Sequence, residues 1–327
     1  MHNNNDANAN DSHLGGNMLR NSIFNKYKNM KLIILLVLIL CIVFSACSFR
    51  SGSNNTDEGE SYQTLIVTSF YPIYIFTLNI VGDIPQVKVI NMTESQTCCL
   101  HDYQLMPKDL KALQKADIFV YNGAGLETFL DKVISQLPDL KLIEASKGIS
   151  LIENSEGEVN PHVWVSISGA IAEVKNIIDG LAEADPSNGE QYKKNGQDYI
   201  ERLESLKQKM HNDLNDIVER DIITFHEAFP YFAEEFDLNV VSVIEDESGS
   251  DFSAGELAQI IRDIEQSGVK ILFAEPHNTE KAELIAKQTG TEVYILDPIE
   301  SAHGNAAADS YEKAMLENLE VLKEALK

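Results

Sequence analysis

The chain has 327 residues, a formal net charge of -25 and a hydrophobic fraction of 44%. This length allows one large domain or two, and the apolar fraction is ordinary for a globular protein. The negative charge argues against nucleic acid as a partner, because phosphates would be repelled, and it favours cations over anions.

The N-terminal part of the chain has the pattern of an export signal. Residues 32–44 form an unbroken apolar run that three lysines precede. A bilayer span needs roughly 20 apolar residues, so this run fits the apolar core of a cleaved secretory signal better than an anchor helix, which is the alternative. Its ending, Ser-Ala followed by Cys47, resembles a bacterial lipoprotein signal. We expect residues 1–46 to be removed, Cys47 to be lipidated and residues 47–60 to be a flexible linker.

Beyond the linker, strands and helices alternate. Runs rich in branched apolar residues predict strands at residues 64–69, 87–91, 116–121, 141–143, 221–225, 239–243, 270–273 and 292–296. Helices are predicted from about residue 73 and at 107–115, 127–135, 227–236, 253–267, 278–289 and 308–326. This alternation is typical of parallel sheets with right-handed crossovers.

A long amphipathic segment separates the two halves. Asp185 and Pro186 are a favourable helix start, and apolar residues then recur at helical spacing to residue 217. We predict a helix over residues 186–218, roughly 48 Å long. An exposed coiled coil is the alternative. The expected architecture is therefore α/β, with two lobes of mostly parallel sheet, residues 61–185 and 219–327, joined by one long rigid helix.

Candidate metal ligands lie in loops beside these strands. His101 lies in the loop after the second strand, His226 follows the fifth, and Asp297 follows the last. His162 lies in an Asn-Pro-His-Val-Trp segment before the long helix. Ligands of open α/β sheets bind at the carboxyl ends of strands, and three imidazoles with one carboxylate suit tetrahedral zinc. The sequence therefore predicts a metal site of four ligands that only the folded chain brings together.

Other residues leave alternatives open. Cys98 and Cys99 are either added thiolate ligands or small apolar filler. His277 and His303 are either spare ligands or ordinary loop residues.

Enzyme signatures are missing from the chain. His226 and Glu227 begin like a metalloprotease motif, but Pro230 stands where its second histidine belongs. A nucleophile elbow and a phosphate-binding loop are also absent from the sequence. We therefore expect no catalysed reaction.

Several segments together resemble one protein family. These are residues 100–107, 160–164, 225–232, 296–298 and 311–326. They are similar to the zinc/manganese solute-binding lipoproteins of bacterial ABC importers, the cluster A-I metal receptors. The resemblance implies two lobes bridged by a rigid helix and one metal in the cleft, with ligand roles for His101, His162, His226 and Asp297.

The resemblance also implies a function. We expect a monomeric receptor, lipid-anchored at the outer face of the cell membrane, that binds Zn2+ and delivers it to an ABC permease and its ATPase. His226 favours zinc, because a glutamate at this position accompanies manganese in the family; Mn2+ or Fe2+ is the alternative. A zinc-dependent hydrolase with Glu227 as base, or a surface adhesin, would be a function of another class.

Overall fold

The structure, a computed structural model, describes residues 62–93, 103–153, 157–244, 252–301 and 306–327. The predicted leader, linker and lipidated Cys47 lie outside these residues, as do Cys98, Cys99, His101 and His303. Within the described ranges, no helix has both the length and the apolar character needed to cross a membrane.

The first sheet contains four parallel strands. They are β1 (Thr64–Thr68), β2 (Val87–Asn91), β3 (Ile118–Tyr121) and β4 (Lys141–Glu144), in the order β2-β1-β3-β4. Alternate residues of β1 enter different cores: Ile66 packs on the side of α2 (Tyr71–Val81), whereas Leu65 and Val67 pack on the side of α3 (Pro107–Lys115). A strand covered on both faces explains the unbroken apolar run in its sequence.

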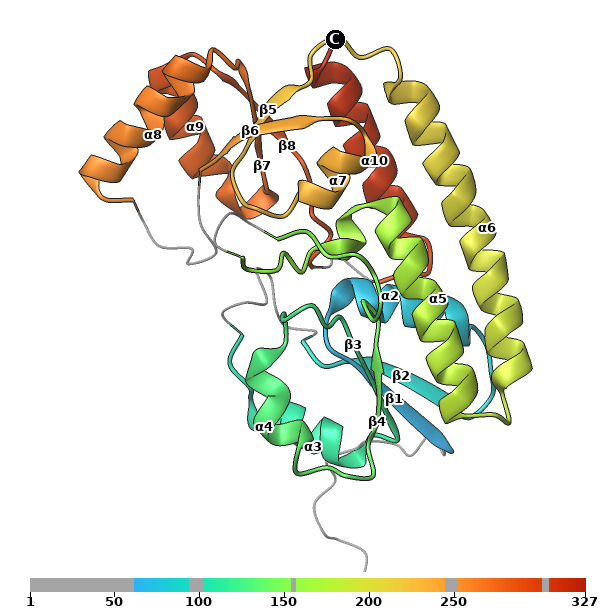
Figure 1. Cartoon of the computed structure of the whole chain (residues 1–327). Coiled ribbons are helices and arrows are strands. Elements are labelled where there is room, and N and C mark those ends of the chain that lie inside the picture. Colours follow the sequence, from blue (N-terminus) through green and yellow to red (C-terminus); the bar gives the residue numbers. More distant parts are fainter. Residues whose placement is uncertain (1–61, 94–102, 154–156, 245–251, 302–305) are drawn as a thin grey trace, which may run out of the picture. The chain divides into compact units, whose positions relative to one another are not determined.

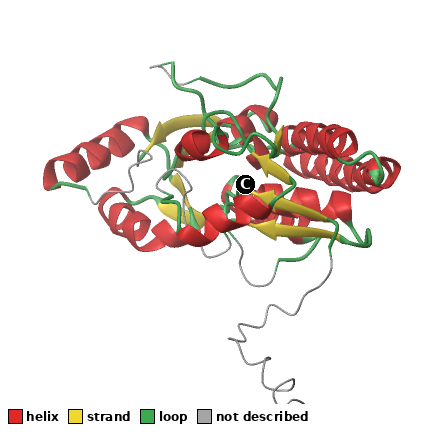
Figure 2. Ribbon diagram, turned by 90° about the horizontal axis from the view of Figure 1, so that it is seen from below, coloured by secondary structure: helices red, strands yellow, loops and turns green. Residues whose placement is uncertain are grey.

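The second sheet repeats this topology. Its strands are β5 (Asp221–Thr224), β6 (Asn239–Val243), β7 (Ile271–Ala274) and β8 (Glu292–Ile295), in the order β6-β5-β7-β8. The helices that follow its strands are α7 (Pro230–Glu235), α8 (Ala254–Ser267), α9 (Thr279–Thr289) and α10 (Ser310–Ala325). Helices lie on both sides of the strands (Figure 2). All eight predicted strands and the α/β fold class are confirmed, with ends that shift by up to two residues.

Two helices connect the sheets. α5 (Ile167–Ala184) and α6 (Gly189–Leu214) lie side by side, and α6 also contacts α2 of the first half and α10 of the second (Figure 1). At 26 residues, α6 is about 39 Å long, shorter than the predicted helix by three residues at its start and four at its end. It packs into the main core instead of standing in solvent as a coiled coil, since Tyr192, Tyr199 and Leu203 are fully buried.

The sequence prediction missed α5. The Ser166 hydroxyl caps this helix by accepting a hydrogen bond from the Gly169 N–H at 2.9 Å. Its buried residues, among them Ile171, Val174 and Ile178, recur at helical spacing. The missed helix matters for the site because it begins directly after the His162 segment.

One hydrophobic core runs through both halves. It contains Ile66 and Val120 of the first sheet, Tyr199 of α6, and Ile222 and Phe273 of the second sheet. Because the apolar side chains of both halves pack into this shared core, the two sheets are held together as one compact unit of residues 61–327.

Gly196 permits the close approach of α5 and α6. A Cβ added at Gly196 would lie 2.2 Å from Cδ1 of Ile178 on α5. We expect Gly196→Ala to lower the free energy of unfolding by about 1–3 kcal/mol, because overpacking forces the helices apart. Chemical denaturation measures this. The matched control is Gly189→Ala on the same helix, where the nearest atom is 3.4 Å away. Equal effects of the two substitutions would contradict the packing argument.

Candidate metal centre

His162 lies at the entrance to a short 3-10 turn, η3 (Val163–Val165), that leads into α5. Its side chain is almost fully buried. Asn160 fixes the imidazole: its Oδ1 lies 3.1 Å from Nδ1 of His162 and accepts the backbone N–H of His162 at 3.0 Å. Since Asn160 Oδ1 is an acceptor, this contact favours the tautomer with the proton on Nδ1, in which Nε2 is the nitrogen that can bind a metal.

Asn160 also connects the two histidine segments. Its Nδ2 donates to the carbonyl of Glu227 at 2.8 Å, and its own carbonyl accepts the Tyr231 hydroxyl at 2.8 Å. Glu227 directly follows His226, and Tyr231 lies on α7. These bonds hold the segment of His162 against the loop that leaves β5.

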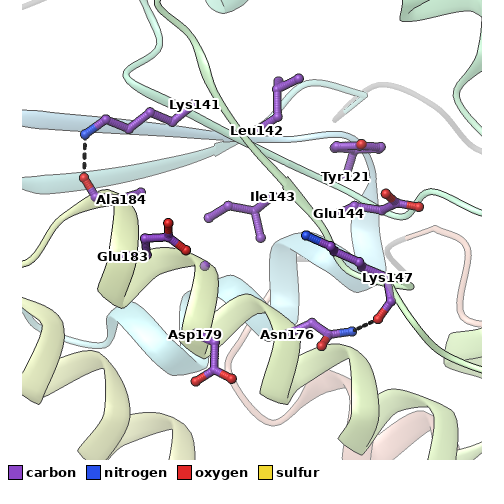
Figure 3. Close-up of a pocket in the computed structure, with 11 residues that line it drawn as sticks. Tyr121, Lys141, Leu142, Ile143, Glu144, Lys147, Asn176, Asp179, Glu183 and Ala184 are labelled. Carbon is purple, nitrogen blue, oxygen red and sulfur yellow. Dashed lines mark hydrogen bonds between the residues drawn. The ribbon is translucent and has the colours of Figure 1, made fainter.

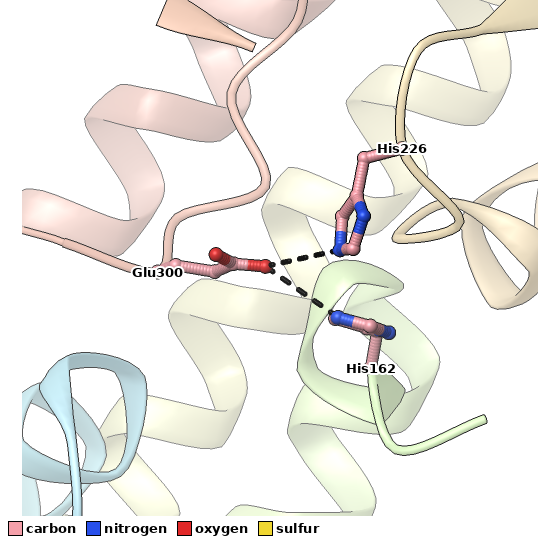
Figure 4. A group of neighbouring side chains, drawn as sticks. All are labelled: His162, His226 and Glu300. Atoms are coloured by element: carbon pink, nitrogen blue, oxygen red, sulfur yellow. Dashed lines mark ion pairs between the residues drawn. The ribbon is translucent and has the colours of Figure 1, made fainter. Parts of the chain in front are cut away.

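His226 and Glu300 complete a three-residue group with His162. His226 follows β5 and is 7% exposed, and its ring centroid lies 5.2 Å from that of His162. Glu300 Oε1 lies 3.5 Å from His162 Nε2 and 4.0 Å from His226 Nε2. The three side chains point toward one another from separate segments (Figure 4).

The spacing of these atoms suits a small metal ion. One candidate ligand atom from each residue lies within 4.8 Å of the other two. Tetrahedral zinc with bonds of about 2.0–2.1 Å places its ligands about 3.3–3.4 Å apart. The two N–O distances exceed this spacing by about 0.1–0.2 Å and about 0.6–0.7 Å, so the side chains would close further around a bound ion.

The turn that carries Glu300 depends on Asp297. The Asp297 carboxylate accepts the N–H of Ile299 at 2.7 Å, and Ile299 has a φ of 61°. A left-handed conformation is rare for a β-branched residue and persists only where its surroundings enforce it. Asn318 of α10 bonds both the N–H and the carbonyl of Asp297, at 2.9 and 2.8 Å. Asp297 therefore shapes the turn that directs Glu300 toward the histidines.

The structure brings some predicted residues together and separates others. His162 and His226 meet, whereas the three-residue group of the described residues contains Glu300 and not Asp297. His277 lies in the 3-10 turn η4 (Pro276–Asn278), outside that group. His101, Cys98, Cys99 and His303 lie outside the described residues, so their roles remain predictions. Glu300 was missed, although an acid in the loop after the last strand was the available signal.

Two buried carboxyl groups, those of Glu127 and Glu173, lie in the first half. Glu127 accepts the N–H groups of Asn122 and Gly123 at 2.8 and 3.0 Å, and burial raises its pKa to about 7. Glu173 of α5 is fully buried; burial chiefly, and the charge of Glu127, raise its pKa well above the ordinary value. Asn122 Nδ2 donates to the carbonyl of Pro161 at 3.0 Å, which connects this region to His162.

A separate pocket of about 710 Å³ lies between β4 and α5 (Figure 3). Lysines and acids line it together, including Lys141, Lys147, Glu144 and Asp179. It contains none of the three grouped residues, so the candidate metal centre and this pocket are different places.

These features define a class of protein. Two parallel sheets with the same strand order, connected by long helices, present a His-His-Glu group whose members come from both halves. This is the architecture of a metal-binding solute-binding protein.

Comparison with known proteins identifies the family. Residues 66–325 match the zinc-uptake complex component A family, described as periplasmic and called ZnuA, and the chain belongs to this family. The chain is 30% identical over 311 residues to the high-affinity zinc uptake system protein ZnuA of Bacillus subtilis (strain 168), covering 89% of this chain and 97% of that protein. The family consists of transport binding proteins, which confirms the expectation that the chain is not an enzyme.

Two further relatives have different lengths and bound metals. The zinc-binding lipoprotein AdcA of Streptococcus pneumoniae (strain R6) is 30% identical over 315 residues, which are 90% of this chain and 61% of AdcA. A crystal structure of Zn(II)-bound AdcA matches with a TM-score of 0.70 over 80% of this chain and 57% of AdcA. FpvC of Pseudomonas aeruginosa, solved with Ni2+, matches at 30% identity with a TM-score of 0.72 over 80% of this chain and 96% of FpvC.

The buried carboxyl of Glu173 predicts a pH effect on stability. The pKa of Glu173 is higher in the folded chain than its ordinary value of about 4.5. At a pH between these two values, Glu173 is ionised in the unfolded chain but still protonated in the folded chain. The contribution of Glu173 to wild-type stability should therefore fall as pH rises from 4.5. Glu173→Gln lacks this effect, so its stability relative to wild type should rise by up to about 1.4 kcal/mol per pH unit.

Denaturation of both proteins from pH 5 to 7 measures this difference. Glu183→Gln, an exposed acid on the same helix, is the control and should change stability by no more than about 0.5 kcal/mol throughout. A flat difference between Glu173→Gln and wild type would contradict the prediction.

Proposed function

We propose that this protein is an extracytoplasmic receptor, anchored by lipid at Cys47, that captures Zn2+ and delivers it to an ABC permease. The observation that carries the proposal is the convergence of His162 Nε2, His226 Nε2 and Glu300 Oε1 from segments of both halves. Membership of a zinc-uptake family supports the assignment of zinc as the transported ion and of a transporter as the partner. The lipoprotein AdcA, a relative of 30% identity, supports the anchor.

The proposed ligand set is His101, His162, His226 and one carboxylate. His101 enters through its predicted role and lies outside the described residues. Glu300 is the better candidate for the carboxylate, because its Oε1 already faces both imidazoles, whereas an Asp297 oxygen bonds the N–H of Ile299. Four protein ligands fill a tetrahedral site, which suits binding and release of an ion more than hydrolysis, where water needs an open position.

Zinc is the preferred cargo on chemical grounds. Imidazoles with one carboxylate form a borderline-soft set that binds zinc more strongly than manganese. Manganese remains the specific rival, because FpvC, at 30% identity, has also been solved in complex with Mn2+. Metal analysis of protein purified without added metal, followed by competition between Zn2+ and Mn2+, distinguishes the two.

The two acids of the last loop provide a direct test of the site. Glu300→Gln removes the charge that faces the imidazoles, and we expect zinc affinity to fall by more than about 100-fold. This loss is larger than the roughly 10- to 100-fold loss typical when a residue that only supports a metal ligand is replaced. Asp297→Asn keeps a carbonyl oxygen that can accept the N–H of Ile299, so its affinity should stay within about tenfold of wild type.

Competition against a chelating dye at pH 7.5 measures both affinities. The two substitutions are matched, since each replaces one carboxylate of the same turn by its amide. A larger loss with Asp297→Asn than with Glu300→Gln would return the ligand role to Asp297. Unchanged zinc affinity in both variants would argue against a metal site here.

A further inference from the structure

Trp164 is the single tryptophan of the chain, and it lies two residues after His162 in the 3-10 turn η3. Its side chain is 1% exposed. The indole ring packs edge-on against Phe70, with centroids 4.7 Å apart, and lies 5.1 Å from the His162 imidazole. Trp164 is therefore part of the wall behind one ligand of the metal group.

The indole N–H crosses to the other half of the molecule. It donates to the carbonyl of Pro298 at 2.8 Å. Pro298 is buried and lies two residues before Glu300, in the segment that follows β8. One side chain from the His162 segment is thus bonded to the backbone of the segment that carries the carboxylate.

Both ends of this connection are fixed by α10. The carbonyl of Trp164 accepts the hydroxyl of fully buried Tyr311 at 2.8 Å. The other end is held by Asn318, which bonds Asp297, the residue before Pro298. The Trp164–Pro298 bond therefore joins two segments that are each held in place by the same helix.

We propose that Trp164 is a positioning residue that sets the separation between the His162 imidazole and the Glu300 carboxylate before the metal arrives. The inference rests on the proposed metal-binding function and adds a role for a residue outside the ligand set. A core-filling ring alone needs no N–H. Here the N–H satisfies a buried carbonyl next to the ligand turn, and its loss leaves that carbonyl without this donor.

Trp164→Phe tests the role because it keeps an aromatic ring and removes the donor. We expect zinc affinity to fall about tenfold, as for loss of one hydrogen bond to a buried group. The control is Ser168→Ala, which removes another bond between the halves, from Ser168 Oγ to Glu235 Oε1 at 2.7 Å; neither residue belongs to the metal group. Its zinc affinity should stay within twofold of wild type.

A double-mutant cycle separates positioning from general packing. If Trp164 acts through Glu300, then Trp164→Phe should change zinc affinity by less than about twofold when Glu300→Gln is already present. A structural role alone would give the same tenfold loss in both backgrounds, and that additive result would overturn the proposal. Chelator competition on all four proteins supplies the affinities.

A second replacement of Trp164 tests the same role in case the phenylalanine variant misfolds. Because the chain has one tryptophan, growth on benzothienylalanine replaces Trp164 alone with a ring of similar shape that has sulfur in place of the N–H. The same tenfold loss is expected. If wild type binds zinc and both replacements bind it within twofold, the positioning role is overturned and the metal function stands. If wild type itself binds no zinc, the proposed function fails.

Discussion

The carboxylate of Glu300 faces two imidazoles, and the surrounding structure holds these three side chains together. Its oxygen lies 3.5 and 4.0 Å from the Nε2 atoms of His162 and His226, and all three side chains are at least nine-tenths buried. Such a cluster requires segments from both halves to be fixed at ångström precision. The shared hydrophobic core, the α5–α6 connection and the bonds of Asn160 supply that precision, and they explain why a binding protein has so continuous an interior.

The buried polar groups around the site are arranged by the same constraint. Asn122 joins the Pro161 carbonyl to the loop that Glu127 holds, so a segment next to His162 is anchored deep in the first half. A raised pKa keeps Glu173 protonated in this interior, which limits the buried negative charge. The Asn122 bonds thus support the His162 side of the site, while the acidic character of the whole chain favours the approach of cations.

The sequence predicted most of the fold because the inner strands of both sheets are buried on two faces. Branched apolar runs such as those of β1 and β7 have few other interpretations. His162 and His226 could be selected as candidate ligands because each lies in a loop next to a predicted strand or helix. Glu300 was not predictable in the same way. Its direction depends on the left-handed φ of Ile299 and on the bond from Asp297, which are properties of one turn and leave no periodic pattern. α5 had both a capping serine and helical spacing, so that omission was avoidable.

A structure of the protein crystallised with zinc, with anomalous scattering collected at the zinc edge, would locate the metal. We expect one peak bonded to Nε2 of His162, Nε2 of His226 and a carboxylate oxygen of Glu300, at about 2.0–2.2 Å, with His101 as the fourth ligand. A zinc ion bound elsewhere, or bound in the cleft without His162 and His226, would contradict it.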